Sequence, residues 1–147
     1  MNIKRYDEVD GEYGQEAELV VKEYFKRNGY SVTHLPYGKY KNDLLFVNQH
    51  EQFYVEVERC GMQRWSSDKP DFPWETINVP LRRQVTEDRL FLTVRGDLQR
   101  AVVMFPNDLK IIEPCELNNK HVNGEKFRKC PIERCLLLDL TQPVNRS

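Results

Sequence analysis

The chain has 147 residues, of which 39% are hydrophobic and 31% are charged, and its formal net charge is −1. This composition is typical of a soluble globular protein, and no apolar run approaches the ~20 residues that a membrane-spanning helix needs. A net charge near zero argues against a protein that holds nucleic acid by bulk electrostatics alone. The length predicts a single domain over residues 1–147. The order of the elements predicted below places its core at about residues 10–105, followed by a β-rich C-terminal extension at residues 106–147.

The N-terminus and the cysteines predict an intracellular, cytoplasmic protein. The first residues turn acidic at Asp7, where a signal peptide requires an apolar stretch. The cysteines form no Cys-x-x-Cys pair, so we interpret them as reduced thiols. They are Cys60, Cys115, Cys130 and Cys135. The last three could surround a zinc ion with His121, but the spacing matches no common zinc motif, and buried or partly exposed thiols are favoured.

The first predicted elements are a helix and a strand. Residues Gln15 to Asn28 are expected to be helical, because apolar residues recur at helical spacing and Asn28-Gly29 is a typical C-terminal stop. The apolar positions are Leu19, Val20, Val21, Tyr24 and Phe25. Residues 30–34 are β-branched and aromatic and predict a strand. Residues 35–41 then predict a loop, punctuated by Pro and Gly.

Residues 42–59 predict a β-hairpin, with strands at residues 42–47 and 52–59 and a polar turn between them. In the second strand, alternation places Val55 and Val57 on one face and Glu56 and Glu58 on the other. Asp43 enters the first strand, so it is expected to lie beside this pair of acids. Three neighbouring carboxylates repel one another unless a cation joins them. The pattern therefore indicates a site for a divalent metal ion.

The second half of the chain is predicted to continue with a loop, a helix and several strands. Residues 60–73 are expected to be an irregular connection, and Pro80 fits the first turn of a helix that ends at about Glu87. Residues 90–94 and 101–105 are short apolar runs, and the short link between them predicts antiparallel neighbours. We expect a polar loop at residues 118–129, a final strand or buried turn at residues 135–140 and a tail at residues 141–147.

The order of these elements and the acids on the hairpin resemble the PD-(D/E)XK nuclease superfamily, the fold of many restriction enzymes and Holliday-junction resolvases. In that superfamily an Asp starts the second core strand, and an acid-x-Lys triplet lies on the third. The matching residues here are Asn42-Asp43 and Glu56-Val57-Glu58. The resemblance implies an α/β (α+β) protein with a restriction-endonuclease-like αβββαβ core, in which helices flank a mixed sheet. Glu58 departs from the usual Lys, although some restriction enzymes carry Glu-x-Glu and still cut.

The resemblance also implies a set of catalytic and metal-binding residues. The implied catalytic residues are Asp43, Glu56 and Glu58 on the hairpin and Glu18 on the helix. Glu18 is included because the pattern Glu-x-x-Val-x-x-Tyr-Phe-x-x-x-Gly-Tyr that starts there looks like the first helix of the superfamily. Asp43, Glu56, Glu18 and the backbone carbonyl of Val57 are the implied metal ligands. Hard oxygen ligands favour Mg²⁺ or Mn²⁺. Glu58 could bind a second metal ion or orient the attacking water. The alternative role for Glu18 is that of a solvated acid on the polar face of the helix.

Basic and aromatic residues near the hairpin are candidates for substrate binding, because such side chains contact phosphates and stack on bases. The candidates are Lys41, Arg59, Arg64, Trp65, Arg82, Arg83 and Gln84. An ordinary solvated loop is an equal alternative for Lys41, and local ion pairs with Glu87 and Asp88 are the alternative for the residues at 82–84. For Trp74, covering an exposed edge of the core is at least an equal alternative to substrate contact.

The sequence thus predicts a metal-dependent nuclease that hydrolyses phosphodiester bonds, above all in DNA, by endo- or exonucleolytic cleavage. A homodimer is a fair expectation for this superfamily when both strands are cut. One alternative keeps the fold without catalysis, as in a nucleic-acid-binding or assembly protein, for example a viral one. A second is a nuclease of the same fold that acts on RNA. A third is a small α+β interaction protein whose acids are surface charges of the hairpin.

Overall fold

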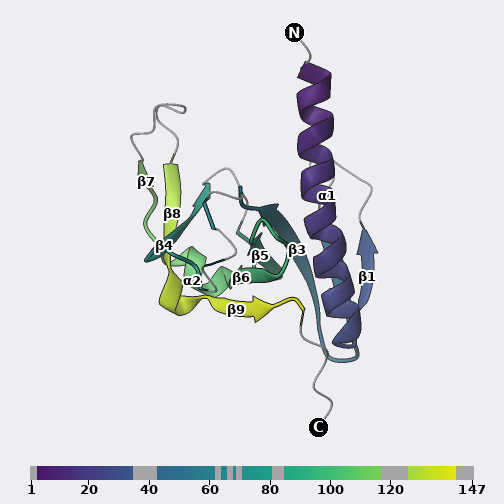
Figure 1. Cartoon of the computed structure of the whole chain (residues 1–147). Coiled ribbons are helices and arrows are strands. Elements are labelled where there is room, and N and C mark those ends of the chain that lie inside the picture. Colours follow the sequence, from purple (N-terminus) through teal and green to yellow (C-terminus); the bar gives the residue numbers. More distant parts are fainter. Residues whose placement is uncertain are drawn as a thin grey trace.

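The fold is a mixed α/β arrangement of two sheets and one long helix. In the computed structural model the described residues are 3–34, 43–61, 64, 65, 68, 71–80, 85–116 and 126–141. Helix α1 (Ile3–Arg27) runs along one side of the main sheet (Figure 1). The main sheet has the strand order β1-β2-β3-β5-β6-β9. These strands are β1 Ser31–His34, β2 Asp43–Val47, β3 Gln52–Arg59, β5 Arg89–Val94, β6 Arg100–Met104 and β9 Leu136–Asp139.

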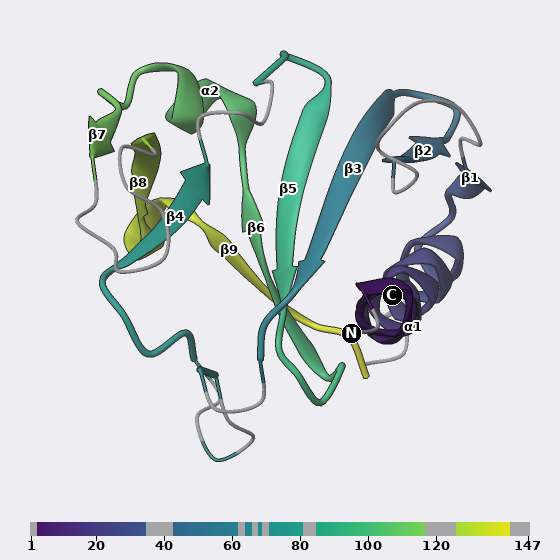
Figure 2. The ribbon, with the colours of Figure 1, turned by 90° about the horizontal axis from the view of Figure 1, so that it is seen from above.

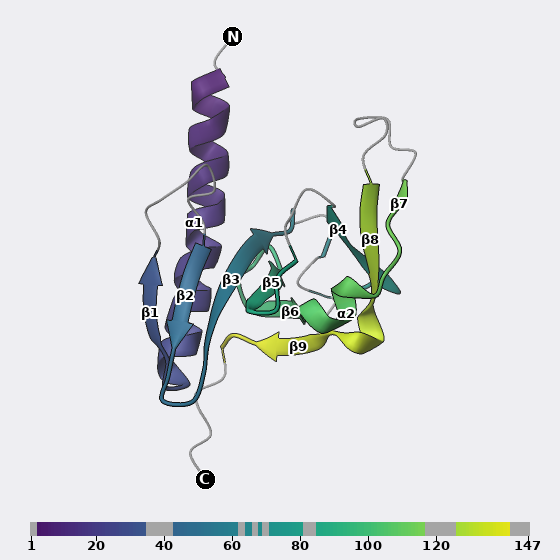
Figure 3. The same cartoon turned by 180° about the vertical axis from the view of Figure 1, so that it is seen from behind.

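The main sheet is mixed. Strands β1, β2 and β3 form an antiparallel meander that lies against α1 (Figure 3). Strand β5 pairs with β3 in parallel, whereas β6 and β9 extend the sheet antiparallel to their neighbours. The predicted hairpin and the antiparallel pairing of the two later apolar runs are therefore confirmed. The β3–β5 pairing could not be read from the sequence, because residues 60–88 separate the two strands.

A smaller sheet covers the other face of the main sheet (Figure 2). Its order is β4-β8-β7, with strands β4 Thr76–Pro80, β7 Cys115–Glu116 and β8 Lys126–Pro131. Two short helices, α2 (Pro106–Lys110) and η1 (Ile132–Arg134), connect the strands. Among the described residues, no helix has the length and apolar character to cross a membrane.

The two faces of the main sheet carry separate apolar cores. On the α1 side, Ala17, Val21 and Phe25 recur every four residues on the helix and pack on the apolar positions of β2 and β3, including Phe46 and Val55. Burial of each such side chain contributes roughly 1.5–3 kcal/mol. On the other side, the second core joins the small sheet to β5, β6 and α2. Its buried members are Ile77, Val79, Phe91, Met104, Leu109 and Cys130.

Helix α1 is longer than the sequence predicted, because it begins at Ile3 rather than Gln15. Because Gly11 and Gly14 lower the intrinsic helix propensity of this segment, the helix start predicted from the sequence is too late. Tertiary contacts stabilise this part of the helix. The hydroxyl of Tyr13 donates to the carbonyl of Cys60 at 2.5 Å, and the guanidinium of Arg59 lies over the Tyr13 ring with its carbon 3.8 Å from the ring centroid.

The helix predicted from Pro80 to about Glu87 was wrong at both ends. Pro80 is the last residue of β4, Val85 and Thr86 are irregular, and Glu87 lies in a turn, whereas residues 81–84 lie outside the described part of the chain. Strand β4 forms because Ile77 and Val79 alternate with exposed neighbours, which is the period of a half-buried strand.

The C-terminal part of the chain contributes to both sheets. The loop predicted at residues 118–129 ends earlier than expected, because β8 begins at Lys126 and pairs with β4 and β7. The final predicted strand is confirmed as β9, which joins the main sheet beside β6. Residues 142–147 of the predicted tail lie outside the described residues.

Candidate functional site

The β2–β3 hairpin brings the predicted acids into register. Asp43 and Glu56 are directly opposed partners, and such positions in an antiparallel pair share one face of the sheet. Val55 and Val57 are buried under α1, so Glu56 and Glu58 lie on the opposite face, as the alternation predicted. The side chain of Asp43 is outside the described part of the structure. The hairpin register is therefore the observation that links these three positions.

Glu56 has a basic neighbour that sequence reasoning missed. Arg89 is the parallel-strand partner of Tyr54, and its Nη1 lies 4.0 Å from Oε2 of Glu56. Both side chains are largely covered, with 20% of Arg89 and 13% of Glu56 exposed. The guanidinium of Arg89 also lies 5.6 Å from the centroid of the Tyr54 ring. Arg89 precedes an apolar run, and only the β3–β5 pairing places it beside Glu56.

A cleft lies between the carboxylate face of β3 and strand β4. A small hollow contains Glu56 and Glu58, and a larger one of about 560 Å³ extends from it past Arg64 and Trp74. Glu58, Asn78 and Thr93 line both hollows, so the two are adjacent. We call this space the β3–β4 cleft. It combines carboxylates with a basic and aromatic wall, as a site for an extended anionic polymer requires.

The thiol of Cys60 lines the β3–β4 cleft but is a poor nucleophile. Burial, reinforced by the negative charge of Glu58, raises its pKa to about 11. A thiol must lose its proton to attack or to bind a metal ion. Cys60 therefore remains protonated at neutral pH, and we do not expect it to act as a nucleophile or a metal ligand in the cleft.

The prediction that Trp65 stacks on substrate is wrong. Its side chain is fully buried, in edge contact with Phe72 at 5.5 Å between ring centroids, and the guanidinium of Arg95 lies 5.8 Å from its ring. Trp74 is 47% exposed and lines the cleft. The residues that flank Trp65 did not indicate its burial, because loop packing rather than flanking charge decides which ring is buried.

Arg59 is occupied by internal contacts and is not available to hold substrate as predicted. Its Nε donates to the carbonyl of Gly96 at 3.0 Å, and its Nη1 donates to the carbonyl of Tyr13 at 3.0 Å. Nη1 also lies 3.7 Å from a carboxylate oxygen of Glu16, and only 9% of the side chain is exposed. Arg59 therefore fastens α1 to the end of β3.

The other basic candidates differ in what is known of their positions. Arg64 is exposed and lines the β3–β4 cleft, which agrees with a role in substrate binding. The remaining candidates lie outside the described residues: Lys41, Arg82, Arg83 and Gln84.

Glu18 lies on the opposite side of the main sheet from Glu56. It is only 5% exposed, on the helix that covers the face of Val55 and Val57. Among the described side chains, no three His, Cys, Asp or Glu residues are grouped so as to hold a metal ion. Glu18, Glu56 and Glu58 therefore do not form a threefold ligand set among these side chains, and the side chain of Asp43 lies outside the described ones.

The cysteines also form no threefold group in the described region. Cys130 and Cys135 lie close together, with 3.7 Å between their sulfurs, but Cys115 is not grouped with them. The hydrogen bond from Cys135 lowers the pKa of Cys130. His121 lies outside the described residues, and all four cysteines are free thiols.

Fold and site together define a mixed α/β protein whose main sheet carries an acidic cleft on the face away from α1. No protein-family model, curated protein or solved structure matches the chain significantly.

Proposed function

We propose that the chain is a metal-dependent nuclease of the PD-(D/E)XK type that hydrolyses phosphodiester bonds in DNA. The observation that carries the proposal is the hairpin register, in which Asp43 opposes Glu56, and Glu58 follows on the same face beside the β3–β4 cleft. The order of a helix, an antiparallel meander and a strand parallel to β3 supports it. The crossover from β3 to β5 departs from the αβββαβ pattern, because it contains β4 in its described part.

The donor set fits a hard divalent cation. Carboxylate and carbonyl oxygens are the ligands that Mg²⁺ and Mn²⁺ prefer, and Asp43, Glu56 and the carbonyl of Val57 would hold the ion. Such an ion supplies positive charge to the phosphate oxygens and lowers the pKa of water. Glu58 is exposed in the cleft, so its carboxylate can accept the proton of the attacking water.

The cleft walls favour a substrate with unpaired nucleotides. Arg64 can donate to a backbone phosphate, and the exposed ring of Trp74 offers a surface for one base. Stacking on an aromatic side chain needs a base that has left the duplex, and it contributes roughly 1–3 kcal/mol for each base. We therefore expect single-stranded or branched DNA to be a better substrate than an intact duplex.

The proposal is tested by cleavage of labelled single-stranded, branched and duplex DNA with Mg²⁺, Mn²⁺ or EDTA. Wild-type protein is compared with Glu56→Gln and Glu58→Gln, and with Glu133→Gln as a control, because Glu133 is an exposed acid on η1 outside the cleft. We expect a loss of activity of about a hundredfold or more for Glu56→Gln and none for Glu133→Gln. Cleavage that persists in EDTA or in Glu56→Gln would falsify the metal mechanism.

A second function, nucleic-acid binding without cleavage, is favoured by one specific observation. The guanidinium of Arg89 lies 4.0 Å from the carboxylate of Glu56 and can neutralise it without a metal ion. This alternative predicts that DNA binds and stays intact, and that calorimetry detects no Mn²⁺ binding to the wild-type protein. The nuclease proposal predicts Mn²⁺ binding that becomes tighter in Arg89→Gln, since the competing cation is then gone.

A further inference from the structure

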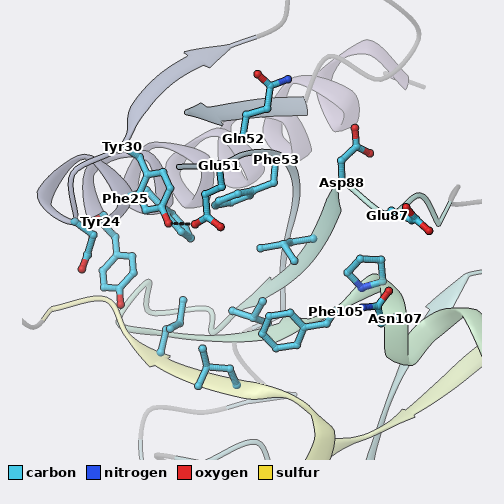
Figure 4. A pocket seen from close by; sticks show the side chains of 16 residues that line it. Tyr24, Phe25, Tyr30, Glu51, Gln52, Phe53, Glu87, Asp88, Phe105 and Asn107 are labelled. Carbon is cyan, nitrogen blue, oxygen red and sulfur yellow. Dashed lines mark hydrogen bonds between the residues drawn. The ribbon is translucent and has the colours of Figure 1, made fainter. Parts of the chain in front are cut away.

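A second cavity lies on the α1 side of the main sheet, away from the β3–β4 cleft (Figure 4). Its volume is about 520 Å³, which is within the range of ~300–1,000 Å³ that small-molecule sites occupy. It opens between the C-terminal end of α1, the start of β3, and strands β5, β6 and β9. It shares no lining residue with the cleft. We call it the α1 pocket.

The floor of the α1 pocket is apolar. Leu90, Val103 and Leu138 come from three neighbouring strands and point to the α1 side, where they belong to or pack against the first core. Phe25 and Phe53 contribute aromatic rings, whose centroids are 5.9 Å apart. Such a floor gains free energy when it covers an apolar ligand, roughly in proportion to the area removed from water.

The rim of the α1 pocket is acidic. Glu51, Glu87 and Asp88 carry carboxylates around the opening, and the pocket is lined by no Lys, Arg or His among the described residues (Figure 4). Glu87 is partly neutralised, because Lys110 Nζ lies 2.9 Å from its Oε1. Glu51 and Asp88 have no such ion pair among the described side chains. Their charges attract a cation at the mouth of an apolar space.

Tyr30 fixes one carboxylate of the rim. Its hydroxyl donates a hydrogen bond to Oε1 of Glu51. Burial raises the pKa of Tyr30 to about 12, and the hydrogen bond to Glu51 and the negative charge of Glu51 contribute to the increase. The phenol therefore remains a hydrogen-bond donor at neutral pH. The two basic residues in the last turn of α1 are engaged elsewhere: Arg27 donates to the carbonyl of Leu140 at 2.7 Å, and Nζ of Lys26 lies 3.8 Å from Oε1 of Glu23. Glu51 is therefore held in place while its second oxygen stays available to a ligand.

We infer that the α1 pocket binds a small amphipathic cation, with its apolar body against Leu90, Val103 and Leu138 and its positive group at the carboxylate of Glu51, while Asp88 adds negative charge to the rim. The inference does not depend on the nuclease proposal, because the pocket and the cleft occupy opposite faces of the sheet. It assigns to the chain a ligand class opposite in charge to a nucleic acid.

Three probes that share a 3-phenylpropyl body test the inference: 4-phenylbutylamine, 4-phenyl-1-butanol and 4-phenylbutyrate, which are cationic, neutral and anionic at pH 7. Binding is followed by ¹⁵N–¹H chemical shifts of the full chain. A ligand of this size is expected to bind with a Kd of about 1 mM. We expect the cation to bind about fivefold more tightly than the alcohol, the ratio that corresponds to one charge contact in water, and the anion most weakly.

Matched variants locate the site. Leu136 is 50% exposed on the pocket rim, and Ile111 is 72% exposed outside it. Leu136→Arg places a positive charge at the mouth and should weaken binding of the amine at least fivefold, whereas Ile111→Arg should leave it unchanged. Glu51→Gln combined with Asp88→Asn should remove the preference for the amine over the alcohol, and it serves as the test if Leu136→Arg does not fold.

The inference is overturned by any of three results. One is the absence of shifts near the pocket at 10 mM amine, about ten times the expected Kd. The second is tighter binding of the butyrate than of the amine. The third is unchanged amine binding in a folded Leu136→Arg protein or in the double variant. Binding of the amine in the expected order, lost in the pocket variants and kept in Ile111→Arg, supports it.

Discussion

The opposite environments of the two tryptophans lead to a sharp prediction for matched substitutions. Trp65 is fully buried, whereas Trp74 is 47% exposed at the β3–β4 cleft. An aromatic side chain of this size buries up to ~250 Å², and at about 25 cal/mol per Å² this area corresponds to roughly 6 kcal/mol as an upper limit. Replacement by Ala commonly costs about 3–5 kcal/mol because of the cavity that remains.

Trp65→Ala should therefore lower the free energy of unfolding by about 3–5 kcal/mol, and the milder Trp65→Phe by about 1–3 kcal/mol. Trp74→Ala should change it by less than about 1 kcal/mol, because an exposed ring contributes little to the core. The effects on DNA binding should be reversed. Loss of one stacking ring weakens binding by about 1–3 kcal/mol in Trp74→Ala, whereas a folded Trp65→Phe should bind as the wild type does.

Urea unfolding followed by circular dichroism measures the stabilities, and titration with a single-stranded oligonucleotide in EDTA measures binding without cleavage. The chain has only these two tryptophans, so each Trp→Phe variant reports the other ring by fluorescence. Trp65 should emit at shorter wavelength and be insensitive to DNA, and Trp74 should be quenched by it. Equal destabilisation by the two Ala variants, or solvent-exposed emission from Trp65, would refute the assignment.

Three further experiments test other parts of the structure. Gly14→Ala should stabilise the protein by about 0.5–1 kcal/mol, because Gly14 lies inside α1 with open space for a Cβ. Gly29→Ala should destabilise it, because φ is +92° at Gly29, and thermal unfolding compares the two variants. Burial opposes ionisation of Asp97, but the hydrogen bonds from Arg95 and a backbone amide outweigh it and lower its pKa. The Asp97 carboxylate thus stabilises the folded protein above its unfolded pKa of about 3.9, and this stabilisation is lost as the pH falls through the lower pKa of the folded state. Asp97→Asn should therefore destabilise the protein at pH 7 and make its stability depend less on pH in the acid range. Cys60, with a pKa of about 11, should react with iodoacetamide slowly at pH 8 in the folded protein and much faster in urea, as followed by peptide mass mapping.

The hairpin and its two faces could be predicted from the sequence because period-two alternation is a local signal. Val55 and Val57 face α1 and Glu56 faces the other way, as the residue order alone required. The register of Asp43 opposite Glu56 follows from the hairpin turn, where the amides of His50 and Glu51 donate to the side chain of Asn48. The alternation along the strand and the hairpin turn were therefore sufficient to predict this part of the candidate site.

The missing parts of the site depend on contacts between distant segments. Arg89 reaches Glu56 only because β5 pairs in parallel with β3, and no local pattern encodes that pairing. Trp65 is flanked by Arg64 and Ser66 in the sequence, yet its side chain is fully buried, whereas Trp74 is 47% exposed. Phe72 contacts both rings, at 5.5 Å and 5.2 Å between ring centroids, so the burial of Trp65 depends on how the whole loop packs. Pro80 was compatible with both a helix start and the end of a strand that pairs at Phe127.

The position of β3 within the sheet explains why the acids on it can act as a preorganised site. The strand is paired on both edges, with β2 on one side and β5 on the other, and its apolar face is held under α1. Glu56 therefore projects from backbone that is fixed on three sides, and its side chain is only 13% exposed. A partly covered carboxylate loses hydration that a cation must replace. Arg89 supplies one positive charge at 4.0 Å, whereas a divalent ion at the ~2.1 Å of direct coordination supplies twice the charge at half the distance. The nuclease proposal and the binding alternative thus differ in which of these two cations neutralises Glu56, which makes Arg89 the most informative position to substitute.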